Sequence, residues 1–326
     1  MAYKKYVNNF SKSTMIQRGK ENYQDIISEI TDIIEANNVD KGYTLLIDLG
    51  TIYTYYLLTW KEDVLVQNGN RSEALKQMHM SLFYQCMAQD LYKIIYPRST
   101  VSYSFRDVVA ALIHFTMFGW EKEEHILFDF IAEHLDEKIM KANDWNKHVW
   151  FLLELYLQYR NKTLFGVNQQ VHKTVKEQLE ASEMEYSLIP DDLGIYSEVL
   201  ASWSTADEKV AADLIGSMIV YHSEMASDLG HSIEFGDYVY GFYPYEILFL
   251  IHVRQLQGLP VPGQYEELLM NTAEAKMTIQ APEPYPKKDA LLEQIDGFYR
   301  KHYPEYALNR YLEELFQESD KESVSC

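Results

Sequence analysis

Two clusters of histidine and acidic residues are the positions where side-chain types and spacing could support chemistry. The first, at the predicted end of a helix, contains His222, Glu224, Asp228 and His231. Imidazole and carboxylate groups bind metals, but this spacing matches no standard metal site, which favours an ordinary polar helix end. The second cluster contains Glu121, Glu123, Glu124, His125, Glu133 and His134. It is typical of an exposed helix face with a half-buried histidine, and catalysis is the less favoured alternative.

Standard catalytic and metal-binding motifs are missing from the sequence. No histidine has a glutamate three residues before it, so the Glu-x-x-His pairs of di-iron bundles are excluded. There is no His-Glu-x-x-His, no Cys-x-x-Cys, no Gly-x-Ser-x-Gly elbow and no glycine-rich phosphate loop. Cys86 shares a predicted helix face with Met78 and Leu82, which favours a core position over a nucleophile. We therefore expect a protein that is not an enzyme and has no cofactor and no metal.

The charge of the chain is strongly negative and unevenly distributed. There are 29 Lys and Arg against 49 Asp and Glu, a formal net charge of −20. We therefore do not expect the protein to bind nucleic acid directly, because phosphate contacts need basic residues. Residues 181–246 hold 13 acidic residues and one basic residue, Lys209, which is more than half of the net charge.

Such a concentration of like charge does not stabilise a fold. A solvated face is one interpretation, and a binding surface for a cationic partner is the other. Tyrosines among the carboxylates favour the second interpretation, because aromatic side chains often anchor interfaces. The predicted partner-binding residues are Glu224, Asp228, Glu234, Asp237, Tyr238 and Tyr240.

Composition is typical of a folded protein with a substantial core. The 326 residues are 47% hydrophobic and 14% aromatic, enough for one large or two moderate domains. The two cysteines form no disulfide framework, and the first residues lack the apolar core of a signal peptide. Residues 43–60 are the most membrane-like segment, but Asp48 and several threonines and tyrosines favour a buried helix. We expect a cytoplasmic protein that does not enter a membrane.

Apolar residues recur at helical spacing along most of the chain, and alternation of period two is nearly absent. This pattern predicts an all-α, bundle-like fold of two packed helical units with little or no strand. A break at residues 96–100 separates an N-terminal unit, residues 1–98, from a C-terminal domain, residues 99–326, whose later part is a proline-containing outer layer. The lysine-rich residues 1–20 are expected to be an irregular lead-in.

The segment 217–259 is central to the prediction. It contains the end of an amphipathic helix, predicted to begin at a Thr205–Glu208 capping box and to bury Val210, Leu214, Met218, Tyr221 and Met225. The tyrosine-rich connection 235–246 is expected to be packed, because buried tyrosines need partners for their hydroxyls. A second, very apolar helix should start near Pro244, since proline is accepted in the first helical turn.

This segment resembles the C-terminal domain of PoNi-type immunity proteins. The similarity covers roughly residues 101–270 and rests on Tyr221-His-Ser-Glu-Met, His231, the segment Tyr238-Val-Tyr-Gly-Phe-Tyr-Pro-Tyr-Glu and the apolar helix after it. The resemblance implies an all-helical bacterial cytoplasmic protein that neutralises a cognate antibacterial nuclease, a DNase toxin of the PoNe type.

Three functional hypotheses follow. In the first, the acidic surface competes with DNA for the basic groove of a toxin, although binding away from the toxin active site is equally allowed. In the second, the chain is a helical scaffold that binds another protein without a toxin. In the third, it is a helical enzyme with an unrecognised site. The first is favoured.

Overall fold

The computed structural model describes residues 1–93, 103–135, 140–141, 146–231, 234–279 and 281–311. Its regular structure is almost entirely helical, which confirms the all-α prediction. The predicted break at 96–100, the unit boundary between 98 and 99 and the end of the chain after residue 311 lie outside the described residues.

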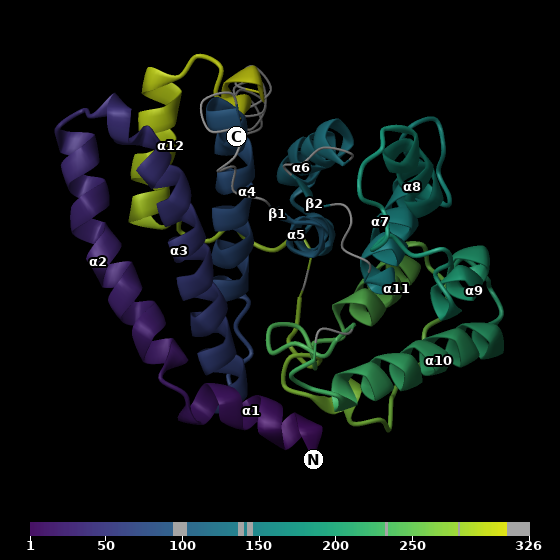
Figure 1. Ribbon diagram of the computed structural model, residues 1–326. Coiled ribbons are helices and arrows are strands. Elements are labelled where there is room, and N and C mark those ends of the chain that lie inside the picture. Colours follow the sequence, from purple (N-terminus) through teal and green to yellow (C-terminus); the bar gives the residue numbers. More distant parts are fainter. Residues whose placement is uncertain (94–102, 136–139, 142–145, 232–233, 280, 312–326) are drawn as a thin grey trace, which may run out of the picture.

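Twelve α-helices account for most of the described residues (Figure 1). They are α1 (Ala2–Lys12), α2 (Met15–Glu35), α3 (Gly42–Lys61), α4 (Glu73–Lys93), α5 (Phe105–Phe118), α6 (Glu121–His134), α7 (Lys147–Arg160), α8 (Val171–Ala181), α9 (Ile195–Ser202), α10 (Glu208–Ser227), α11 (Tyr245–Leu256) and α12 (Ala290–His302). The short helical turns are η1 (Val39–Lys41), η2 (Glu62–Val66), η3 (Leu269–Asn271) and η4 (Ala307–Tyr311). Two two-residue strands, β1 (Tyr103–Ser104) and β2 (Met140–Lys141), pair in parallel.

The first layer contains α2, α3 and α4, which lie side by side in chain order (Figure 1). Helix α12, from the other end of the sequence, packs against all three of them. A division of the chain near residue 98 would therefore leave the C-terminal helix in contact with the N-terminal unit. Proline-containing segments lead to α12, which buries Leu291, Leu292 and Ile295.

The expectation that residues 1–20 are irregular is wrong. They form α1 and the start of α2, and α1 contacts η2 and α10. Tyr6 and Phe10, four residues apart, are buried at 0% and 3% exposure. Their burial on one helix face stabilises α1 despite its lysines. The Tyr6 hydroxyl also donates to Glu274, 2.7 Å away, in a contact with the far end of the chain.

Helix α5 connects the first layer to the rest of the molecule. It contacts α4 on one side and α6, α7 and α11 on others, and all its side chains are buried except Arg106 and Asp107. Helices α7 and α11 are also mostly buried, as their apolar sequences predict. Helices α8, α9 and α10 lie outside this core, where α9 contacts both α7 and α10.

The segment around α10 and α11 agrees with the sequence prediction in part. Helix α11 begins at Tyr245, directly after Pro244, and the connection before it is packed, with Tyr240 and Tyr243 fully buried. Asp207, rather than a Thr205–Glu208 box, caps α10, because its carboxylate accepts from the backbone N–H groups of residues 209 and 210.

The buried face of α10 also differs from the prediction. The fully buried side chains are Ala211, Ile215, Met218, Ile219, His222 and Ala226. Val210, expected in the core, is 39% exposed. The buried stripe of α10 is shifted by about one residue from the predicted one. Val210 and Val220 face outward.

Candidate functional site

The predicted partner-binding residues separate into surface and interior positions. Glu224 and Asp228 are exposed, and Tyr238 is half-buried. Glu234 is only 7% exposed and Tyr240 is fully buried, so we correct their selection as surface contacts. Asp237 is half-buried and already bound to a basic side chain, so it is also unsuited to a partner. Glu234, Asp237 and Tyr240 all belong to the connection between α10 and α11, and their side chains hold this segment, residues 234–246, onto the core.

Glu234 is the centre of a buried hydrogen-bond network. Its carboxylate accepts from the backbone N–H and the Nδ1–H of His148, both at 2.5 Å, and from the Tyr221 hydroxyl at 2.6 Å. Burial alone would raise the pKa of Glu234, but His148 and these hydrogen bonds outweigh it, so the pKa is lowered. Next to it, the Phe235 ring lies between the rings of His148 and His222, with centroids 4.2 and 3.6 Å away.

Asp237 has an equivalent role at the other side of the connection. It pairs with Arg106 of α5, with Oδ2 and Nη1 separated by 2.7 Å. Its Oδ1 accepts from the backbone N–H groups of Val239 at 2.6 Å and Tyr240 at 2.9 Å, which shapes the turn. Burial raises the pKa of Asp237, but Arg106 and these N–H groups lower it further, and the net shift is downward. The Arg106 guanidinium in turn lies 5.1 Å from the Tyr240 ring centroid.

The predicted histidine clusters are also explained by structure. His222 turns inward, where Nδ1 lies 2.7 Å from Glu246 Oε1 and Nε2 lies 3.1 Å from the Gly241 carbonyl. It therefore does not join Glu224 and Asp228 in a metal site. His231 instead lies beside Asp228 at the exposed surface, 3.3 Å away.

In the second cluster, Glu124 is fully buried and forms an ion pair with Arg160 at 2.5 Å, which makes it a structural residue. The ligand atoms of Glu133, His134 and Asp90 lie within 4.8 Å of one another. His134 Nε2 and Asp90 Oδ1 are 3.4 Å apart, and Glu133 also pairs with Arg310.

The exposed acids of residues 181–246 remain as the candidate surface. Asp191 pairs with Lys176 and Asp192 with Lys147. No Lys or Arg among the described residues forms an ion pair with the other exposed carboxylates, which are Glu183, Glu185, Glu198, Asp207, Glu208, Asp213, Glu224 and Asp228. Most of these lie on or next to α9 and α10.

One face of α10 combines these charges with apolar surface. Asp213, Ser217, Val220 and Glu224 follow one another at spacings of four, three and four, so they form one exposed stripe on the helix. The two carboxylates are about 16 Å apart along the axis, at 1.5 Å per residue. An open groove beside α9 lies along this stripe, and it is lined by Ile195, Ala212, Asp213, Gly216, Ser217, Val220, Tyr221 and Glu224. Val220 is 53% exposed.

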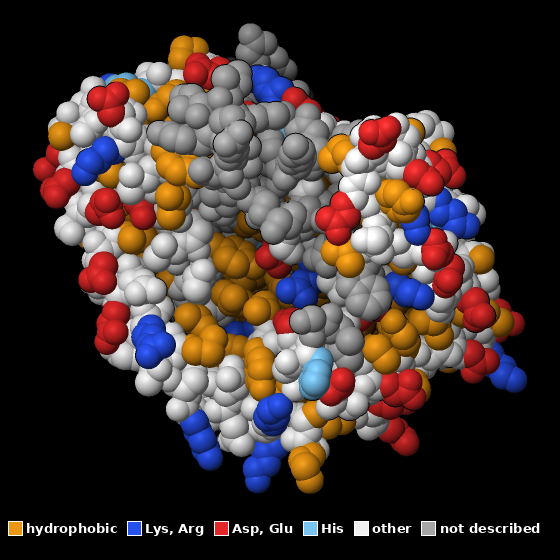
Figure 2. Space-filling model, viewed as in Figure 1, with side chains coloured by type: hydrophobic (Ala, Val, Ile, Leu, Met, Phe, Trp, Pro, Cys, Tyr) orange, Lys and Arg blue, Asp and Glu red, His pale blue; other side chains and the backbone are white. Residues whose placement is uncertain are grey.

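We call Asp213, Ser217, Val220 and Glu224 the α10 stripe. Figure 2 shows Asp and Glu side chains on both outer flanks of the molecule, so negative charge is not confined to residues 181–246. Charge alone therefore does not define a site. The distinguishing feature of the α10 stripe is an exposed aliphatic side chain between two carboxylates without a basic ion-pair partner among the described residues.

Comparison of the chain with protein-family models, curated proteins and solved structures found no match. The similarity to PoNi-type immunity proteins thus rests on the sequence segments given above. Within the described part of the chain, every helix is too short or too polar to cross a bilayer.

Proposed function

We propose that this protein is a cytoplasmic immunity protein that binds and neutralises a cognate antibacterial toxin, a nuclease, through the α10 stripe. The observation that supports the binding surface is the position of Val220 between Asp213 and Glu224, all exposed on one helix face. Interfaces commonly combine an apolar centre with a polar rim, and the stripe has this composition. The resemblance to PoNi-type immunity proteins supports the identity of the partner.

A nuclease domain is a suitable partner for chemical reasons. Its nucleic-acid groove needs Lys and Arg, which contact phosphates. Carboxylates at fixed positions on a rigid helix can take the place of those phosphates. The net charge of −20 then accelerates the encounter with a basic protein. Val220 contributes buried apolar area once the complex forms.

In this proposal the carboxylates bound within the protein and the exposed carboxylates have different roles, whereas the sequence prediction assigned both kinds to partner binding. Glu234 and Asp237 hold the 234–246 connection in place and thereby support α10, whereas Asp213 and Glu224 face the partner. Binding at the toxin active site and binding away from it both use the same surface on this chain. A scaffold that binds a different cationic protein is the alternative function, and the same stripe supports it.

Co-expression separates these functions. The nuclease encoded next to this chain should kill cells when expressed alone, and the wild-type protein should restore survival and co-purify with the nuclease. The double variant D213K/E224K should restore survival poorly. If the wild-type protein neither protects nor co-purifies, the immunity function is wrong, and capture of another basic protein through the same residues would favour the scaffold.

A further inference from the structure

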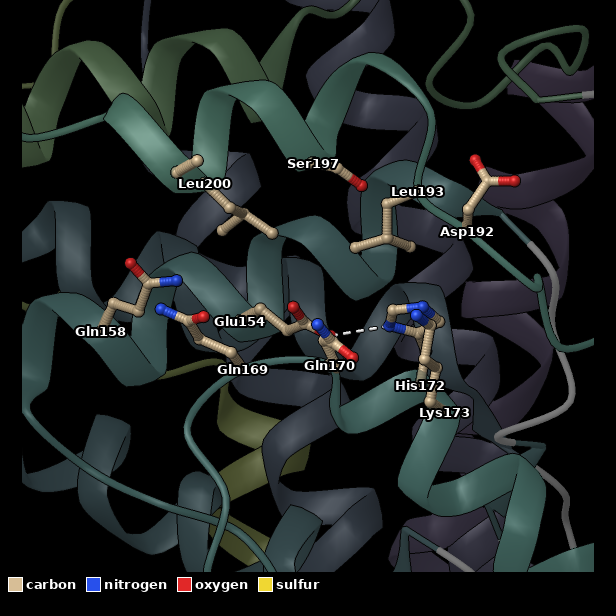
Figure 3. Close-up of a pocket in the computed structure, with 11 residues that line it drawn as sticks. Glu154, Gln158, Gln169, Gln170, His172, Lys173, Asp192, Leu193, Ser197 and Leu200 are labelled. Carbon is tan, nitrogen blue, oxygen red and sulfur yellow. Dashed lines mark hydrogen bonds and ion pairs between the residues drawn. The ribbon is translucent and has the colours of Figure 1, made fainter.

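A half-enclosed pocket lies between α7, α8 and α9, separate from the α10 stripe (Figure 3). Its volume is about 230 Å3. It is lined by Glu154, Gln158, Gln169, Gln170, His172, Lys173, Asp192, Leu193, Ser197, Leu200 and Ala201. Pockets that bind drug-sized ligands measure about 300–1,000 Å3, so this pocket suits a smaller molecule.

The floor of the pocket contains a buried pair, Glu154 of α7 and His172 of α8. The two side chains are 2% and 3% exposed, and Glu154 Oε1 lies 2.8 Å from His172 Nδ1 (Figure 3). A carboxylate beside Nδ1 fixes the tautomer in which Nδ1 donates, and Nε2 of the neutral ring then carries a lone pair. No hydrogen-bond partner for this buried Nε2 exists among the described residues. Buried polar atoms usually have a partner, so the pocket lacks a donor at this point.

A second unsatisfied atom lies one helical turn further along α7. The Trp203 indole N–H donates to Gln158 Oε1 at 2.8 Å. Since indole can only donate, this contact fixes which end of the amide faces Trp203. Gln158 Nε2 is therefore a donor on the other side, and it has no partner in the described part of the chain. The pocket thus needs an acceptor near Gln158 and a donor near His172.

The opposite side of the pocket is mostly apolar. Figure 3 shows Leu193 and Leu200, with Ser197 between them, facing the row that contains Glu154 and Gln158. The leucines are 1% and 9% exposed and offer C–H contacts to a ligand.

The charged lining residues argue against a charged ligand. Glu154 and Asp192 disfavour an anion, and because these carboxylates already pair with His172 and Lys147, neither needs a cation as a partner.

We propose that this pocket binds a small uncharged polyol of monosaccharide size. Hydroxyl groups both donate and accept, so one molecule supplies the donor that His172 Nε2 lacks and the acceptor that Gln158 Nε2 lacks. Its C–H surface packs on Leu193 and Leu200. The assignment is independent of toxin binding, because the residues involved are not those of the α10 stripe.

Ligand-observed NMR on the full-length protein tests the assignment. The probes are D-glucose, D-ribose and D-mannitol, with L-serine as a zwitterion and methylguanidinium as a cation. At least one sugar or alditol should give a saturable signal, and Ser197→Phe, which fills the pocket from the exposed helix α9, should weaken its binding by at least about tenfold. Ser197→Ala keeps the space and should retain binding within about threefold.

Ala201→Phe fills the same pocket from a second exposed position and replaces Ser197→Phe if that variant does not fold. Gln158→Leu should also weaken binding, since it removes the donor. The proposal is wrong if no polyol binds, if a bound polyol is insensitive to Ala201→Phe and Ser197→Phe, or if serine or methylguanidinium competes better than every polyol.

Discussion

Replacing Glu234 by alanine should destabilise the protein strongly, whereas the same change at Glu224 should be nearly neutral. The two glutamates are ten residues apart in the same acidic segment. Glu234 is buried and accepts three hydrogen bonds, two from His148 and one from Tyr221. Glu224 is exposed on α10.

The magnitude follows from these contacts. A buried donor that loses its acceptor costs about 1–3 kcal/mol, and Glu234→Ala takes the acceptor from two donors of His148 and from the Tyr221 hydroxyl, so we expect a loss of about 3–5 kcal/mol. An exposed substitution away from such features stays within about 0.5 kcal/mol, which is the expectation for Glu224→Ala. The lowered pKa of Glu234 means that its carboxylate stabilises the fold above the ordinary pKa of 4.5. This contribution is lost as the pH falls through the lower pKa of the folded state.

Urea unfolding followed by circular dichroism measures both free energies of unfolding, at pH 7 and again at pH 4. The difference in the free energy of unfolding between wild type and Glu234→Ala should be large at pH 7 and smaller at pH 4. If the free energy of unfolding of Glu234→Ala is within about 1 kcal/mol of the wild-type value at pH 7, the interior role of Glu234 is refuted. An equal loss of stability in Glu224→Ala would refute it as well.

Two further stability predictions concern helix α3. Lys61 and Glu274 form a fully buried ion pair, so Lys61→Met should cost about 3–5 kcal/mol in the same unfolding assay. Lys61→Met combined with Glu274→Met should reduce this loss to about 1–3 kcal/mol, because the buried Tyr6 hydroxyl still lacks the acceptor that Glu274 provides. Equal losses in the single and double variants would contradict this. Burial, and then the negative charge of Glu29, raise the pKa of Asp48 to about 7 from 3.8, so its ionisation destabilises the folded state increasingly as the pH rises between these values. Asp48→Asn should therefore gain about 2 kcal/mol over wild type at pH 8, after allowance for solvent screening, and little at pH 4. A gain that does not change with pH would contradict the assignment.

The helical fold and the buried 234–246 connection could be predicted from local patterns. Apolar periodicity identified α5, α7 and α11, and Pro244 marked the start of α11. The first helix was missed because its lysines dominate the composition of residues 1–20, although Tyr6 and Phe10 have helical spacing. Tertiary packing against η2 and α10 stabilises this helix, and such contacts are not visible in a local pattern.

The candidate site could be predicted only in part, because a charge count does not distinguish buried from exposed carboxylates. The partner of Glu234 is His148, 86 residues earlier, and the partner of Asp237 is Arg106 on α5. The pocket between α7 and α9 was missed entirely. A signal for it did exist, since Glu154 is a single carboxylate inside an otherwise apolar run, which indicates a buried polar partner.

The rate of association with the neighbouring nuclease tests the α10 stripe most directly. Stopped-flow measurements would compare wild type, D213K/E224K and the control D25K/D32K, which makes the same change in net charge on exposed positions of α2. We predict that D213K/E224K associates at least about tenfold more slowly at low salt, and that D25K/D32K stays within about twofold of wild type. Equal rates for the two variants would contradict the stripe as the binding surface.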